Sequence, residues 1–199
     1  DFIGDTFVSN DGDGRDADAS DTGDAILKGE CGGGQPLQDN ASSWHGTHVA
    51  GTIAAVAGNG IGGVGVAYGA KVVPVRVLGK CGGYTSDIAD GITWAAGGTV
   101  AGVPANANPA RVLNLSLGGE GACDTTTQNA INTARSRGAV VVVAAGNDNL
   151  DASAFSPANC QGDDQQRTAS LGDLLENRQQ IADVGDLLVE EQHERVVEN

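Results

Sequence analysis

The sequence predicts an α/β fold in which a parallel sheet is flanked by helices. Apolar runs typical of strands occur at residues 111–117 and 139–145, and strand-like and helix-like segments alternate from residue 70 onward. Strands that are apolar on both faces and joined through helices are typical of parallel sheets. The chain has 199 residues, of which 40% are hydrophobic and 4% aromatic, so we expect one main core built from Val, Ile, Leu and Ala.

Residues 1–24 are predicted to form a loop, because aspartates alternate there with Gly, Asn and Ser and no apolar periodicity is present. Four of these aspartates are close together in the sequence: Asp11, Asp13, Asp16 and Asp18. Calcium prefers several oxygen ligands at about 2.4 Å, so one interpretation is a structural calcium site. The loop lacks the distal Glu of an EF-hand and any flanking helices, which leaves a solvated acidic loop as the alternative.

A helix is predicted to begin at His45 and to continue through an apolar run of small residues to Ala55. Because the run is apolar on nearly all sides, we expect this helix to be buried nearly all round. An imidazole in its first turn would be held rigidly and could still face a cleft, as a general base must. A capping or core histidine is the alternative. A zinc site shared with His48 is not favoured, because the zinc-protease pattern needs a Glu and i, i+4 spacing.

The Val-rich segment 70–78 is predicted to be a strand, with irregular pairing at Pro74. Helix start signals come before residues 86–97, where apolar side chains recur at helical spacing until a Gly pair ends the segment. A strand is expected at 111–117. A helix capped by Asp124 or Thr125 should then run to Gly138, followed by a strand at 139–145 that is buried on both faces.

The carboxyl ends of parallel strands are where α/β sheets place their chemistry. Ser116, Leu117 and Gly118 leave the first strand with small side chains and exposed backbone, which suits pairing with an extended peptide and forming a pocket wall. Asn147 follows the four-valine strand and offers a neutral amide donor that could stabilise an oxyanion. The alternative for Asn147 is a turn residue that tolerates positive φ.

The four cysteines are Cys31, Cys81, Cys123 and Cys160. They lack the close spacing of zinc sites, and an even count fits two disulfides and an oxidising compartment. Three pairings are possible. We prefer Cys31–Cys81 and Cys123–Cys160, since each closes a long loop and would contribute about 3–4 kcal/mol by chain entropy.

The formal net charge of −15 argues against nucleic acid or an anionic membrane as a partner and suits a soluble exported protein. No window approaches 18 apolar residues, and no basic region followed by an apolar stretch opens the chain, so we expect neither a membrane span nor a signal peptide. The absence of Met indicates a mature or truncated start. We expect a monomer.

Three motifs, at residues 45–52, 114–119 and 143–147, together resemble the subtilisin-like serine proteases and follow the family's order. The resemblance covers roughly residues 1–160. The cysteines and residues 80–84 are similar to those of secreted bacterial members of the extracellular alkaline protease type. The resemblance implies a subtilisin-like fold, a serine endopeptidase activity on polypeptide substrates, and secretion.

The resemblance also implies roles for individual residues. His45 would be the general base that takes the proton of the nucleophile, and Asn147 the oxyanion-hole donor. Two segments would sandwich the substrate backbone and line the pocket for the residue before the cut: Gly82, Gly83 and Tyr84 in one, Ser116, Leu117 and Gly118 in the other.

Two catalytic residues of the family are not matched. The family's aspartate ends an apolar strand, whereas Asp21 follows an acidic stretch and lies only 24 residues before His45, so we interpret it as a decoy. The family's serine stands in Gly-Thr-Ser-x-Ala-x-Pro, and that string does not occur. We therefore expect a sheet that is incomplete at both ends and a chain that is inactive alone. A non-catalytic peptide-binding or regulatory relic is the alternative function.

The composition changes after Cys160. Residues 161–199 hold 10 acidic and 3 basic residues, and their apolar positions permit an amphipathic helix. We therefore divide the chain into a partial subtilisin-like peptidase domain, 1–160, and an atypical acidic tail, 161–199, that is helical or disordered. The tail is hypothesised to be a frameshift product, and the alternative is a genuine acidic helix that covers an open sheet edge.

Overall fold

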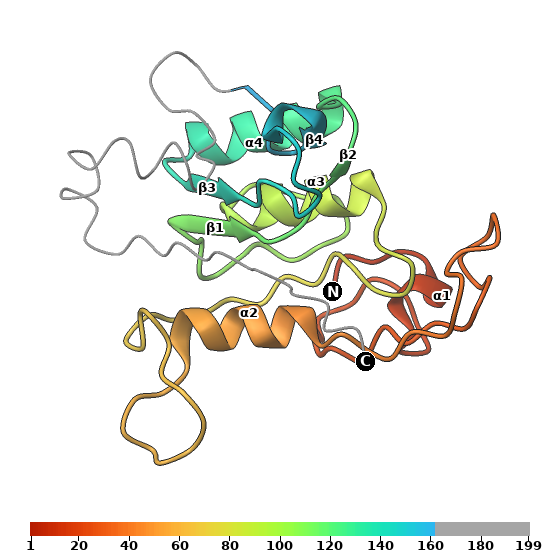
Figure 1. The fold of residues 1–199 in the computed structure, drawn as a ribbon. Helices are drawn as coiled ribbons and strands as arrows, with labels where there is room; N and C mark the ends of the chain where they lie inside the picture. Colours follow the sequence, from red (N-terminus) through yellow and green to blue (C-terminus); the bar gives the residue numbers. More distant parts are fainter. Residues whose placement is uncertain (162–199) are drawn as a thin grey trace.

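The computed structural model describes residues 1–161 of the chain (Figure 1). Its regular elements follow one another as helices, strands and one 3₁₀ turn. In chain order they are α1 (Thr6–Ser9), α2 (His45–Ala54), α3 (Thr85–Ala95), β1 (Val112–Leu115), β2 (Gly119–Glu120), α4 (Thr125–Ser136), β3 (Val140–Val143), η1 (Ala152–Ala154) and β4 (Phe155–Ser156).

The core lies where α3 and α4 pack on the two-stranded parallel sheet of β1 and β3. Residue Leu115 pairs with Val143, and α4 is the connection between the two strands. Ile131 and Ala134 on α4 are completely buried in this core. The predicted parallel α/β arrangement of strand, helix and strand is confirmed.

The two helices of the core begin and end close to where the sequence predicts. Asp124 caps α4, because its carboxylate accepts hydrogen bonds from the backbone N–H groups of Thr126 and Thr127 at 2.8 and 2.9 Å. The chain leaves α4 through Gly138, whose φ of +82° is accessible to glycine at low cost. Helix α3 spans 85–95 where 86–97 was predicted.

A second, antiparallel pair of strands was not predicted. β2 and β4 pair at only two positions, Gly119 with Ser156 and Glu120 with Phe155. Strands of two residues are too short to show an alternating pattern. Their pairing brings the segment after β1 against the segment after η1.

Both predicted disulfides are confirmed. Cys31 is bonded to Cys81 and Cys123 to Cys160, across 50 and 37 residues of sequence. The first ties the loop before α2 to the turn before α3, and the second ties the start of α4 to the end of the described chain.

The prediction that the helix from His45 is buried nearly all round is wrong. Only Val49 of α2 is buried, and the other residues are half-buried or exposed. Figure 1 draws α2 below β1 and β3, with α4 above them. Because α2 makes no extensive packing with another helix or strand of residues 1–161, its apolar side chains have little to be buried against.

The prediction of a strand at 70–78 is also wrong. The segment is assigned to no strand, and within residues 1–161 none of the backbone N–H groups of 71–78 donates a hydrogen bond. The Arg76 carbonyl of this segment accepts a backbone hydrogen bond from the N–H of Phe2 at 2.9 Å. A Val-rich sequence forms a ladder only where a second strand supplies partners.

The acidic loop departs from its prediction in one place. Four of its residues form α1, because Asp5 caps this turn by accepting from the N–H groups of Phe7 and Val8.

No helix in the described part of the chain is long and apolar enough to cross a membrane. The prediction for the acidic tail falls almost wholly on residues 162–199, outside the described residues.

Candidate active site

The carboxyl ends of β1 and β3 lie side by side, because the two strands pair in parallel. The N–H of Ala144 donates to the Leu115 carbonyl at 3.1 Å, so the segments 116–118 and 144–147 continue from neighbouring strands. Ser116 and Leu117 are half-buried, and the Ser116 hydroxyl accepts from the Asn114 amide at 3.0 Å.

Two glycines at these strand ends are in close contact with β4. A Cβ on Gly118 would lie 3.1 Å from the Ser156 carbonyl oxygen, and one on Gly146 would lie 3.2 Å from the Phe155 ring. Gly146 also has a φ of +95°, which side chains rarely tolerate. The strand ends and β4 therefore form one compact surface with bare backbone at both glycines.

Asn147 is exposed directly after this surface. Within residues 1–161, neither its side-chain oxygen nor its amide nitrogen makes a hydrogen bond to the protein. A side-chain amide in this position keeps both of its N–H donors available. It is therefore free to meet a group brought to the carboxyl ends of β1 and β3.

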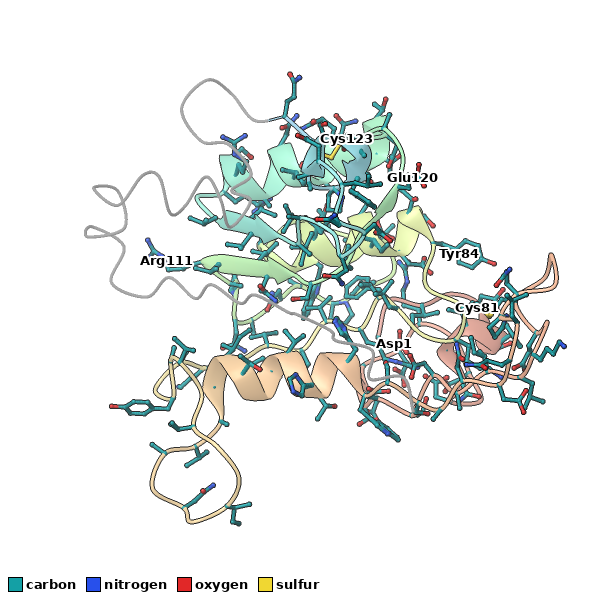
Figure 2. All side chains as sticks on the ribbon, in the orientation of Figure 1. Asp1, Cys81, Tyr84, Arg111, Glu120 and Cys123 are labelled. Atoms are coloured by element: carbon teal, nitrogen blue, oxygen red, sulfur yellow. A yellow bond between two sulfur atoms is a disulfide. The ribbon has the colours of Figure 1, made fainter. Side chains whose placement is uncertain are left out.

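The segment Gly82–Tyr84 forms the turn that begins α3. The N–H of Gly79 donates to the Gly82 carbonyl at 2.8 Å, and Gly82 has a φ of +105°. A Cβ on Gly83 would lie 2.3 Å from the Val77 carbonyl oxygen, so only glycine fits there. Tyr84 projects outward near Cys81 in Figure 2, and its half-exposed ring reaches Asp5 with a hydroxyl–carboxylate distance of 3.4 Å.

His45 is the first residue of α2 and is half-buried. Its N–H donates to the Ser43 hydroxyl at 3.3 Å, and Ser43 in turn donates to the Asp24 carboxylate from its N–H at 2.6 Å and from its hydroxyl at 2.8 Å. The backbone that enters α2 is thus fixed to the acidic loop.

The His45 imidazole itself has no hydrogen bond or ion pair to any residue from 1 to 161. The Asp21 carboxylate accepts from the N–H of Gly23 at 2.9 Å, which is a local turn and not a contact with the imidazole. The structure therefore brings 116–118 together with 144–147, and joins neither segment to His45 by a hydrogen bond. Within residues 1–161 Asp21 makes no hydrogen bond or ion pair with His45, and its interpretation as a decoy stays a prediction.

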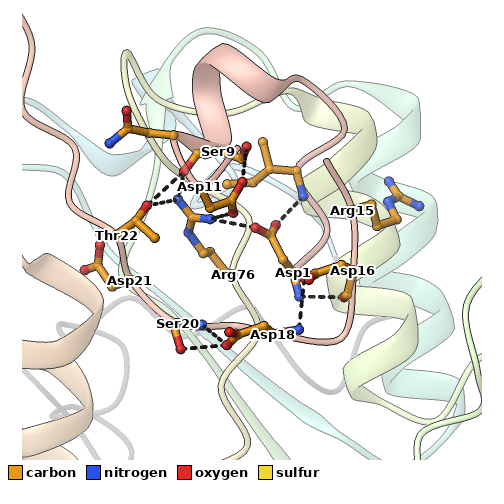
Figure 3. Close-up of polar contacts among 12 residues, drawn as sticks. Asp1, Ser9, Asp11, Arg15, Asp16, Asp18, Ser20, Asp21, Thr22 and Arg76 are labelled. Carbon is orange, nitrogen blue, oxygen red and sulfur yellow. Dashed lines mark hydrogen bonds and ion pairs between the residues drawn. The ribbon is translucent and has the colours of Figure 1, made fainter. Parts of the chain in front are cut away.

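The four aspartates of the predicted calcium loop line one cavity of about 160 Å³ together with Ser20 and Thr22. Figure 3 shows three of them, Asp11, Asp16 and Asp18. Within residues 1–161, no group of three or more His, Cys, Asp or Glu side chains is placed to hold a metal ion. The Ser20 hydroxyl donates to Asp18 at 2.6 Å, and this hydrogen bond lowers the pKa of Asp18.

Sequence reasoning missed the side chain from segment 70–78 that pairs with two aspartates of this loop. Arg76 is buried, and its guanidinium lies 2.6 Å from carboxylate oxygens of both Asp1 and Asp11 and also donates to the Ser9 carbonyl (Figure 3). Burial of the Asp11 carboxyl opposes its ionisation, but hydrogen bonds from Ser9 and Arg76 lower its pKa overall. An arginine in the middle of the Val-rich run 70–78 was the available signal.

The fold and these strand ends define a class: an α/β domain that presents bare backbone and an amide donor at the carboxyl ends of parallel strands. The chain belongs to the subtilase family of peptidases, whose family model matches residues 17–179. The family is one of proteases, and the subtilisin-like fold class predicted from the sequence is confirmed.

Similar proteins support this assignment. The chain is 65% identical over 160 residues to an extracellular protease of Xanthomonas campestris and 55% identical over 162 residues to an extracellular basic protease of Dichelobacter nodosus. Each match covers 80% of this chain and 27% of the relative, so the chain spans about a quarter of their length. A solved protease structure from Pseudoalteromonas arctica is 65% identical, with a TM-score of 0.77 over 80% of this chain and 46% of that one.

Proposed function

We propose that this chain is part of a secreted serine endopeptidase that hydrolyses peptide bonds in polypeptides. The observation that carries the proposal is the parallel pairing of β1 and β3, since the segments 116–118 and 144–147 continue from neighbouring strand ends. An extended peptide would lie along that edge, with Gly82–Tyr84 on its other side.

In this proposal His45 is the general base and Asn147 donates to the oxyanion. Three features support this role for Asn147. Its side chain is exposed, it is neutral, and no group among residues 1–161 competes for its N–H donors. In subtilisin, the type enzyme of the family, removing the equivalent donor lowers turnover by about 10²–10³.

We further propose that the 199-residue chain does not catalyse hydrolysis alone. Two observations support this: the His45 imidazole has no carboxylate partner among residues 1–161, and the sequence has no Gly-Thr-Ser-x-Ala-x-Pro string. In subtilisin, loss of the nucleophile lowers turnover by about 10⁶.

The test is to measure hydrolysis and binding of the same fluorescent peptide by the purified chain. We expect saturable binding, seen as fluorescence anisotropy, and no hydrolysis above buffer. Fluorophosphonate labelling of a single serine would contradict the proposed inactivity. Absence of binding for every peptide would contradict the peptide cleft. Peptide binding that Asn147→Ala leaves unchanged would favour the regulatory relic instead.

Secretion and a monomeric state are part of the proposal. Two relatives are named as extracellular proteases, and all four cysteines are in disulfides, which form in oxidising compartments. Sedimentation of the oxidised chain should give a single species of the chain mass, 19.9 kDa. A species of twice that mass would contradict the monomer.

We also propose calcium as a structural ligand of the acidic loop. Four carboxylates and two hydroxyl side chains around one cavity support it by their oxygen chemistry. As they stand, the carboxylates do not converge, and Asp11 is paired with Arg76, so binding requires them to turn inward.

Thermal unfolding with calcium and with chelator tests this proposal. Calcium should raise the Tm, since a ligand of the folded state at 100 times its Kd stabilises by about 2.7 kcal/mol. Asp16→Asn should remove the increase, and Asp148→Asn, outside the cavity, should not. Equal Tm values in calcium and chelator would contradict the site.

A further inference from the structure

Trp44, the residue before His45, has a left-handed backbone with φ 53° and ψ 30°. This region is unfavourable for a bulky side chain because Cβ approaches the following carbonyl oxygen. The described residues outside glycine with positive φ are Asn10, Trp44, Cys81 and Asn149. Asn tolerates the conformation, and Cys81 is held in a disulfide. Neither of these explanations applies to the positive φ of Trp44.

The flanking residues hold Trp44 in this conformation. The Ser42 hydroxyl accepts from the N–H of Ala25 at 3.1 Å, and Ser43 is bonded twice to Asp24. The indole lies against buried Gly23, where a Cβ would come within 3.3 Å of ring atom Cη2. The two residues before Trp44 are therefore tied to the loop 23–25, and the indole lies against the same loop.

Much of the Trp44 side chain stays exposed although its backbone is strained. The side chain is 50% exposed, makes no capping hydrogen bond to α2, and within residues 1–161 its indole N–H has no acceptor. The other tryptophan differs, since Trp94 donates to the Pro104 carbonyl at 2.7 Å and packs on Phe2. Backbone strain that the surroundings enforce is typical of functional sites.

We propose that Trp44 contacts the substrate directly: its exposed indole face binds a large apolar side chain of the peptide, next to the bond presented to His45. This inference rests on the proposed function of His45. Three features carry it: the position directly before His45, the rigid support of the ring by Gly23, and the large apolar area left open. A fixed aromatic surface binds an apolar group with little loss of conformational entropy.

The test measures peptide binding to the full 199-residue chain by fluorescence anisotropy. The peptides differ at one position, which carries Leu, Ala or Lys in turn. The wild type should bind the Leu peptide about tenfold more tightly than the Ala peptide, a difference of about 1.4 kcal/mol. Trp44→Asn should bind both equally. Because Asn tolerates the left-handed conformation, this variant should unfold at the same or a higher temperature than wild type.

Two further variants complete the experiment. Tyr68→Asn removes another exposed aromatic side chain and should leave the preference for Leu unchanged. Trp44→Phe should keep most of that preference. In the wild type the Leu peptide should shift the tryptophan fluorescence to the blue, and Trp44→Phe should lose this shift. This second measurement does not depend on whether Trp44→Asn folds.

The outcomes separate this inference from the function on which it rests. The role of Trp44 would be overturned if wild type and Trp44→Asn bound the Leu peptide equally tightly, or if the wild type preferred the Lys peptide. Either result would leave the proposed peptide cleft intact. Failure of the wild type to bind any of the peptides would instead overturn the cleft itself.

Discussion

Two regions of this molecule have apolar sequences but differ in how far their side chains are buried. In the region of α3, β1, α4 and β3, the four valines of β3 are paired with β1, and three of them are buried. In the region of α2 and residues 55–78, the Val-rich segment forms no ladder with any part of residues 1–161, and Val72 and Ile61 are 42% and 75% exposed. The difference teaches that an apolar pattern predicts burial only where another element supplies the facing surface.

The free energy of unfolding should therefore depend on the first region far more than on the second. The same substitution can be made in both. Ile131→Ala empties a completely buried position on α4 and should destabilise by about 2–5 kcal/mol, whereas Ile61→Ala at an exposed position should change stability by about 0.5 kcal/mol or less. Urea unfolding of the two variants measures the difference between their free energies of unfolding. Equal midpoints would contradict the expected difference between the two regions.

The two disulfides test whether the regions also differ through the unfolded state. Each closes a loop of similar length, so replacing either pair by serine should cost about 3–4 kcal/mol, and the two costs should differ by only a few tenths. The measurement is denaturant unfolding of the variants Cys31→Ser/Cys81→Ser and Cys123→Ser/Cys160→Ser. A much larger cost for one pair would mean that native contacts, rather than loop length, decide it.

A smaller effect is expected at the helix starts, where α4 has a side-chain cap and α2 has none. Asp124→Ala should destabilise by about 1 kcal/mol and Asp124→Asn by much less, because Asn also caps helices. The hydrogen bond from the Thr127 hydroxyl lowers the pKa of Asp124 below its ordinary value of 3.8.

The pH dependence of this cap follows from the direction of the shift. A pKa that is lower in the folded state means that the stabilisation is present in full above the unfolded pKa and is lost as the pH falls through the folded pKa. The difference in stability between wild type and Asp124→Ala should thus shrink below about pH 3.8. A difference that stays constant down to pH 2 would assign the effect to helix propensity instead.

The sequence predicted those parts of the fold that depend on local pattern and on a partner nearby in the chain. The strand predicted at 139–145 is β3, and the cap at Asp124 is at the predicted place. It did not predict the exposure of α2, nor the two-residue pairing of β2 with β4, which leaves no periodic signal.

The candidate site was predictable to a similar extent. Ser116–Gly118 and Asn147 lie at neighbouring strand ends because parallel pairing requires it. The pairing of Arg76 with Asp1 and Asp11 spans 75 and 65 residues, and no local pattern encodes a contact at that separation. The strained backbone of Trp44 is equally invisible in the sequence, because it is imposed by hydrogen bonds from flanking loops.

Hydrogen exchange of the whole chain, with and without a bound peptide, tests the central claim most directly. Without peptide, the amides of Val140 and Ala144 should exchange slowly and those of 71–78 quickly, since within residues 1–161 the former donate backbone hydrogen bonds and the latter donate none. With peptide, new protection should appear at 116–118 and at 82–84. Protection that appears elsewhere while these two segments stay unchanged would contradict the proposed peptide cleft.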